Sequence, residues 1–142
     1  MPVKESRLRP SESSFSNILK DLFVGSAPRR VKSQPFTGNL NWFTKPRLMT
    51  QIDRIARETK AFALVATGDP ALTVQEDRYR RPFNAYQVVC TSPSEAAIRN
   101  LHRELIARYR HTHAKTLTNA DAKPPTALTS YDGKFHLIVV YR

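Results

Sequence analysis

The sequence is short of acidic residues, and this shortage is the first guide to its partner. Among 142 residues, 12 are Asp or Glu and 23 are Lys or Arg, which gives a formal net charge of +11. A charge excess of this size attracts polyanions. Arginine supplies most of it, and a planar guanidinium binds phosphate through paired hydrogen bonds. The composition favours nucleic acid as the partner, ahead of an anionic membrane surface or an acidic protein.

Glycine and cysteine are also scarce, and this excludes several kinds of site. The four glycines are isolated, so the chain has no P-loop, dinucleotide fingerprint or nucleophile elbow. A single cysteine, Cys90, cannot form an internal disulfide, which fits a reducing compartment. Cys90 lies in an apolar run and is expected to be a buried core thiol. The histidines lack the accompanying ligands that a metal needs, so we assign no metal, cofactor or catalytic residue.

Long apolar runs are absent as well. No run approaches the roughly 20 residues that span a bilayer. The N-terminus lacks the apolar region of a secretory signal. We therefore expect an intracellular protein, cytoplasmic or associated with nucleic acid, with no membrane partner.

The first 40 residues are expected to form a separate segment with a basic tail, an amphipathic helix over 11–24 and a turn-rich basic linker. The apolar positions of that helix follow helical spacing and are Phe15, Ile18, Leu19, Leu22 and Phe23. They suggest an alternative function, a structural or interaction protein that assembles with a partner or a second copy through this helix. The simpler alternative is that the helix folds back on its own core.

Residues 41–142 are expected to form one compact α+β domain, with a small antiparallel sheet of about three strands flanked by helices. Ser92 as N-cap, Pro93 at the first helical position and Glu95 predict the start of a long helix. The expected elements are a helix over 44–59, a strand over 61–67, an irregular stretch over 71–84, a strand over 85–91, a helix to about 110, a loop over 111–133 and a strand over 135–141.

Three basic groups and one further lysine are the candidate nucleic-acid-binding residues. They are Arg29, Arg30 and Lys32 in the linker; Arg78, Tyr79, Arg80 and Arg81 in the loop; Arg99, Arg103 and Arg110 on one side of the long helix; and Lys115. Guanidinium groups gathered on one exposed, arginine-rich surface would contact phosphates, and Tyr79, Phe83 and Tyr109 would stack on bases, which slightly favours RNA or single-stranded DNA. The alternative is an ordinary solvated loop and helix face.

The stretch from Phe62 to the C-terminus resembles a degenerate GIY-YIG nuclease domain. The resemblance lies in a strand that ends in Thr67-Gly68-Asp69-Pro70, an arginine at Arg78, a helix over 101–106 and an asparagine at Asn119. The helix over 101–106 resembles the family's helix that carries the metal-binding glutamate, so the resemblance implies a nuclease scaffold.

The same alignment also shows departures from the family. The Gly-Ile-Tyr strand has no counterpart, the second motif's Tyr and Gly become Ala63 and Val65, and the glutamate position becomes His102. A neutral imidazole is a poor substitute for a carboxylate on Mg²⁺. The resemblance therefore implies a protein that binds nucleic acid without cutting it. A metal-dependent nuclease remains an alternative, with Glu76, Asp77 or Glu104 as its carboxylate.

Overall fold

The computed structural model describes residues 27–37, 44–120 and 127–142. The described elements are, in chain order, β2 (Arg29–Arg30), β3 (Phe36–Thr37), α2 (Lys45–Glu58), β4 (Phe62–Thr67), α3 (Pro70–Thr73), α4 (Asp77–Arg80), β5 (Ala85–Ser92), α5 (Glu95–Thr112) and β6 (Phe135–Tyr141). The predicted α+β class is confirmed. The predicted helix over 11–24, with its five apolar residues, lies outside the described residues.

The sheet has five strands in the order β2-β5-β6-β4, with β3 also paired to β5. Both β4 and β5 run antiparallel to β6, whereas β2 and β3 run parallel to β5. The prediction of about three strands, all antiparallel, was wrong. Residues 29–30 and 36–37, which were expected to lie in a linker, extend the sheet instead. Strands of two residues are too short to show an alternating pattern in the sequence.

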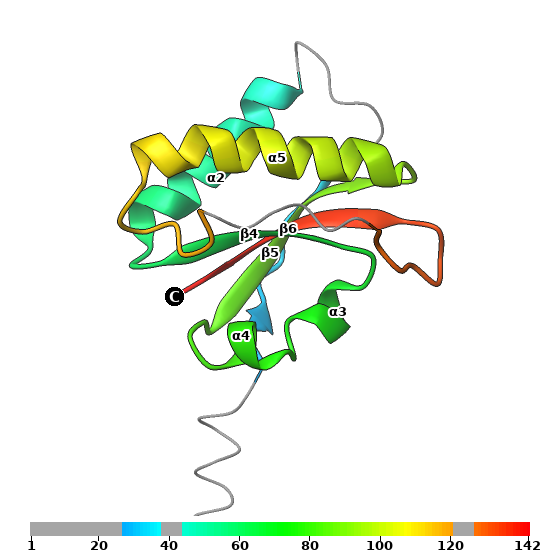
Figure 1. The fold of residues 1–142 in the computed structure, drawn as a ribbon, viewed down its shortest axis with the longest axis horizontal. Helices are drawn as coiled ribbons and strands as arrows, with labels where there is room; N and C mark the ends of the chain where they lie inside the picture. The colour runs from blue at the N-terminus through cyan, green and yellow to red at the C-terminus, as the bar shows by residue number, and fades with distance from the viewer. Residues whose placement is uncertain (1–26, 38–43, 121–126) are drawn as a thin grey trace, which may run out of the picture.

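Helices cover both faces of the sheet (Figure 1), with α2 and α5 on one face and α3 and α4 on the other. Strand β4 shows how the two cores are separated. Phe62, Leu64 and Ala66 pack toward α2 and α5, and the alternate residues Ala63 and Val65 pack toward α3 and α4. Although β4 lies at an edge of the sheet, all six of its residues are buried.

The start of α5 differs by two residues from the prediction. Strand β5 continues through Ser92, and the N-cap is Ser94, whose side chain accepts a hydrogen bond from the Ala97 N–H (3.1 Å). Upstream, Cys90 is only 2% exposed, and burial raises the pKa of its thiol to about 11, as expected for a core thiol. In the described part of the chain, no helix is both long and apolar enough to cross a bilayer.

Candidate nucleic-acid interface

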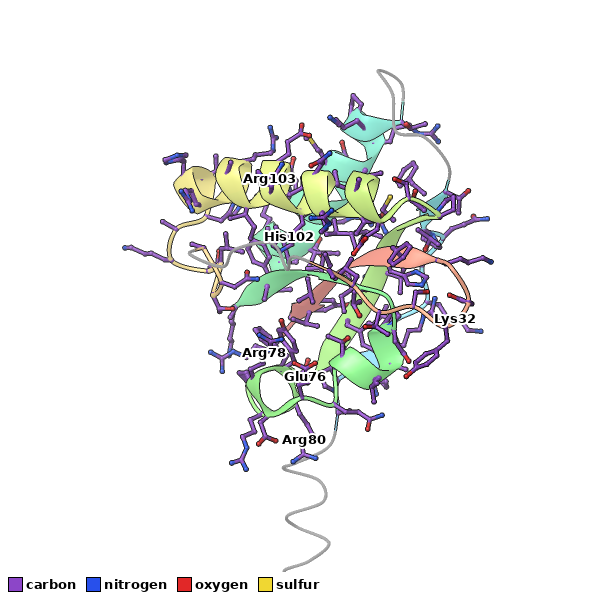
Figure 2. All side chains as sticks on the ribbon, turned by 45° about the vertical axis from the view of Figure 1, so that its right-hand side comes forward. Lys32, Glu76, Arg78, Arg80, His102 and Arg103 are labelled. Atoms are coloured by element: carbon purple, nitrogen blue, oxygen red, sulfur yellow. The ribbon has the colours of Figure 1, made fainter. Side chains whose placement is uncertain are left out.

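The arginines expected to form one binding surface lie on opposite sides of the sheet. Figure 2 shows Arg103 on the outer side of α5, while Arg78 and Arg80 lie with α4 beyond the other face. Arg99 belongs to α5, near its first turn. The expectation of one continuous arginine surface was wrong, because α4 and α5 pack against different faces of the sheet.

Several of the same arginines already have partners. Arg78 pairs with Glu76 (2.8 Å) and Arg80 with Asp77 (3.3 Å), and both pairs are exposed. The guanidinium of Arg103 donates to the Asn100 side chain (2.9 Å). Exposed pairs of this kind contribute little to stability, about 0–1 kcal/mol. They do offset part of the charge on α4, so these residues are weaker candidates for phosphate contacts than the sequence suggests.

The three aromatic residues expected to stack on bases are buried in the core. Tyr79 is 9% exposed, Phe83 5% and Tyr109 0%. Tyr79 and Phe83 fill the core under α3 and α4, and only the guanidinium of Arg78 lies over the Tyr79 ring, 5.0 Å from its centroid. The prediction that these three rings stack on bases was therefore wrong. The preference for RNA or single-stranded DNA that rested on this stacking is lost with it.

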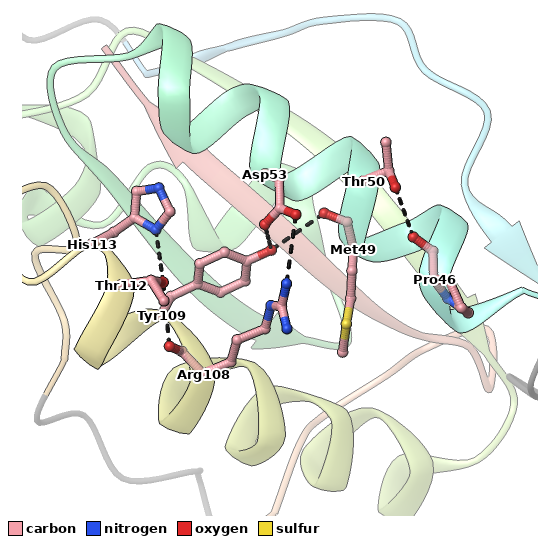
Figure 3. A network of polar contacts seen from close by, with 8 residues as sticks. All are labelled: Pro46, Met49, Thr50, Asp53, Arg108, Tyr109, Thr112 and His113. Carbon is pink, nitrogen blue, oxygen red and sulfur yellow. Dashed lines mark hydrogen bonds and ion pairs between the residues drawn. The ribbon is translucent and has the colours of Figure 1, made fainter.

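Tyr109 holds α5 to α2 through a polar network (Figure 3). Its hydroxyl donates to Asp53 (2.5 Å) and lies 3.3 Å from the Met49 carbonyl oxygen, and the second oxygen of Asp53 lies 3.6 Å from Arg108. Burial, reinforced by Asp53, raises the pKa of Tyr109 well above its ordinary value. The phenol therefore stays protonated and serves as a structural donor.

A different set of cations meets at one end of the sheet. Backbone hydrogen bonds join the chain segments there: Arg29 N–H to the Asn84 carbonyl (3.0 Å), Asn84 N–H to the Tyr141 carbonyl (3.1 Å), and Lys60 N–H to the Arg142 carbonyl (2.8 Å). In Figure 1 the C-terminus lies at this end, beside the start of β4. We call the four exposed cations at this end the basic end, and they are Arg29, Lys60, Arg81 and Arg142. The charge of Arg30 lies instead near His136, at the opposite end of the strands, where it helps to lower the His136 pKa.

Within the described part of the chain, none of the four cations of the basic end forms an ion pair. Three acids lie at the opposite end of the strands, with Asp69 after β4, Glu95 at the start of α5 and Asp132 before β6. Two acids lie closer to the basic end, Glu58 two residues before Lys60 and Asp77 one helical turn before Arg81. The described residues contain 18 of the 23 Lys and Arg residues and 8 of the 12 Asp and Glu residues. The positive potential is therefore expected to be strongest at the basic end.

Two members of the basic end, Lys60 and Arg142, were missed by the sequence analysis. A signal for them existed, because they flank the predicted strands 61–67 and 135–141. Antiparallel pairing of those strands brings the start of one to the end of the other.

The other predicted cations lie nearby or elsewhere. Lys115 precedes Thr116, whose carbonyl accepts from the Phe62 N–H (2.9 Å), so it lies near the start of β4. Arg110 donates to the Ala120 carbonyl (2.8 Å). Lys32, between β2 and β3, lines a groove of about 320 Å³ against α2.

A cavity of about 630 Å³ lies along the outer edge of β4, and we call it the β4-edge cavity. Both helical layers contribute side chains to this cavity. His102 comes from α5, and Glu76 and Arg78 come from the α4 side; β4 runs between these two groups in Figure 2. It is lined in addition by Thr67, Gly68, Asp69 and Asn119, so the positions that carry the family resemblance meet in one place.

His102 and Asn119 both bind the outer edge of β4 at Leu64. The Leu64 carbonyl accepts from Asn119 Nδ2 (2.7 Å) and lies 2.9 Å from His102 Nε2, and the Leu64 N–H donates to Asn119 Oδ1 (3.2 Å). Because a carbonyl only accepts, Nε2 carries the proton. Burial lowers the pKa of His102, so the ring is neutral at pH 7 and Nδ1 is an acceptor. Among the described residues Nδ1 has no partner.

This burial makes stability depend on pH. Below the ordinary histidine pKa of 6.5, His102 becomes protonated in the unfolded chain but stays neutral to a lower pH in the folded chain. Because the unfolded chain binds more protons, the free energy of unfolding should decrease as pH falls. His102→Gln keeps a donor for Leu64 and should lose less stability on acidification than the native protein. Urea unfolding above and below pH 6.5 measures the difference.

The pKa of His136 is also lowered, mainly by burial, so His136 contributes to the same acid sensitivity. His136→Gln, measured in parallel, separates its share from that of His102. An unchanged acid sensitivity in His102→Gln would contradict the assignment.

Gly68 sets one wall of the β4-edge cavity. A Cβ at this position would lie 1.9 Å from the carbonyl oxygen of Thr129. Only glycine allows the segment around Thr129 to cross so closely over the end of β4. The crossing places Leu128 and Tyr131 at the cavity.

The cavity does not provide an evident metal site. Glu76 is paired with Arg78, and within residues 27–37, 44–120 and 127–142 no group of three His, Cys, Asp or Glu side chains could hold a metal ion. Comparison of the chain with protein-family models, with curated proteins and with solved structures found no match.

Proposed function

We propose that this protein binds nucleic acid without cleaving it, through phosphate contacts at the basic end. One observation carries the proposal: four chain segments bring together four exposed cations, none of them paired with a carboxylate in the described residues. Three of the four are arginines, which bind phosphate oxygens in a bidentate manner. Contacts of this type position a nucleic acid but do not read its sequence.

The salt dependence of binding tests this proposal. If all four cations contact phosphates, the logarithm of the binding constant should fall with the logarithm of salt concentration, with a slope of about −3.6 on duplex DNA and about −2.8 on a single strand. Fluorescence anisotropy with labelled single- and double-stranded DNA and RNA, between about 50 and 200 mM salt, measures it. Phosphatidylserine vesicles of equal charge concentration serve as the competing polyanion. Absence of binding at low salt, or preference for the vesicles, would contradict the proposal.

The nuclease alternative is favoured by one specific observation, the meeting of Arg78, His102 and Asn119 at the β4-edge cavity. The family resemblance itself stays a prediction. Because His102 is a neutral, buried imidazole and Glu76 is paired with Arg78, we expect no cleavage. Incubation of the protein with supercoiled DNA and with RNA in Mg²⁺ or Mn²⁺ tests this, and nicking that requires Glu76 would establish the alternative. Assembly through the helix over 11–24 also stays a prediction.

A further inference from the structure

The mouth of the β4-edge cavity carries an unusual apolar exposure. In the described part of the chain, two large hydrophobic side chains are exposed, Leu72 (59%) and Tyr131 (87%). Both line this cavity. Exposed apolar groups gathered at one concave site mark a binding surface rather than chance exposure. A tyrosine ring offers a flat face for stacking another planar ring.

The floor of the cavity carries unpaired backbone groups. Leu64 turns its N–H and C=O away from β6, since both bind the Asn119 side chain. Two residues later, Ala66 turns its own N–H and C=O in the same direction. Neither group has a partner among the described residues. Ala66 therefore presents one donor and one acceptor in the plane of the sheet, at the lining of the cavity.

This combination matches the chemistry of a nucleobase. The edges of a base carry neighbouring donors and acceptors, which proteins read when the base is unstacked. Its faces stack on aromatic side chains. A volume of about 630 Å³ is in the usual range for a small-molecule site. A free fatty chain would leave the Ala66 backbone groups unsatisfied, and an isolated phosphate would leave Leu72 and Tyr131 exposed.

The cavity is also connected to the basic end through α4. Arg78 lines the cavity, and Arg81 at the other end of α4 belongs to the basic end. A strand whose phosphates lie on the basic end could follow α4 and present a base to the cavity. A base must be unstacked to enter, which costs least in a single strand.

We infer that the β4-edge cavity binds one unpaired nucleobase, stacked on Tyr131 with its edge at Ala66, from a strand held by the basic end. This inference rests on the proposed function and adds to it a preference for unpaired strands. The preference comes from the cavity and not from the buried Tyr79, Phe83 and Tyr109.

The test compares two single strands of equal length and charge, an oligodeoxyadenylate and an oligomer of abasic sites. The native protein should bind the base-bearing strand about tenfold more tightly, as for one stacked base. Tyr131→Ala should remove that difference and leave abasic binding unchanged. Tyr131→Phe is the matched control and should retain the difference, because it keeps the ring. Tyr131 is 87% exposed, so neither variant is expected to disturb folding.

A second measurement separates the cavity from the basic end. Adenosine monophosphate at millimolar concentration should shift the NMR signals of the Ala66 amide and the Tyr131 ring in the native protein, and Tyr131→Ala should abolish the Ala66 shift. Equal affinity for the two strands, with no shift from the nucleotide, would overturn the inference and leave the proposed function intact. Binding of the nucleotide without binding of either strand would overturn the proposed function and leave the cavity as a mononucleotide site.

Discussion

Replacing Arg29, Arg81 and Arg142 by glutamine should weaken nucleic-acid binding about 100-fold near physiological salt. Each side chain is exposed in the free protein and would lose one phosphate contact. At about 1 kcal/mol for each contact, three contacts cost about 3 kcal/mol, and a factor of ten corresponds to about 1.4 kcal/mol. The salt slope on duplex DNA should become shallower by about three units. Anisotropy titrations of the native and triple-variant proteins measure both quantities.

The matched control removes the same charge from other places. Arg47→Gln, Arg103→Gln and Lys134→Gln also replace three exposed cations, but these lie on α2, on α5 and before β6. We expect this variant to lose no more than about threefold, through the general field alone. Equal losses in the two triple variants would show that net charge matters and that the basic end has no special role.

Tyr109→Ala should reduce the free energy of unfolding by about 4 kcal/mol, the usual cost of truncating a buried aromatic ring. The side chain is fully buried and packs edge-on against Phe62, with 6.0 Å between ring centroids. The variant would leave a cavity between α5 and β4 and remove a donor to Asp53. Urea denaturation followed by circular dichroism measures the change.

Tyr109→Phe separates packing from hydrogen bonding. It keeps the ring and removes only the hydroxyl, so it should cost about 1 kcal/mol. Arg108 still faces the Asp53 carboxylate in this variant, which limits the penalty. A loss as large as that of Tyr109→Ala would contradict this division and show that the polar network, not the ring, holds α5 to α2.

The elements that could be predicted from the sequence are those with long periodic patterns. Strand β6 has the predicted bounds, and α2 and β4 begin and end within about one residue of theirs. Helices α3 and α4 were missed because four residues make only one turn. Strands β2 and β3 were missed because their pairing with β5 depends on contacts more than 50 residues away in the chain.

The candidate site was less predictable, because it depends on which face of the sheet each helix covers. Spacing along α5 correctly places Arg103 on the exposed helix face, whereas Arg99 is half-buried, with its Nε buried. The spacing carries no information about their distance from Arg78. The burial of Tyr79 could not be predicted either, because a Tyr between arginines in a polar stretch has no apolar periodicity around it. The basic end is defined by strand pairing, and it becomes visible only when the register is known.

The contact between Asn119 and Leu64 has a consequence for solubility. A primary amide has the same donor and acceptor as a peptide group, so Asn119 occupies the place that a neighbouring chain's backbone would take. Upstream, Thr116 and Thr118 occupy the equivalent places at Phe62. Along the part of β4's outer edge that the described residues line, a foreign strand would find only the backbone groups of Ala66 available, too little to template edge-to-edge aggregation. The protein can therefore leave the Ala66 backbone groups open in the β4-edge cavity without the aggregation risk that an unprotected edge strand usually carries.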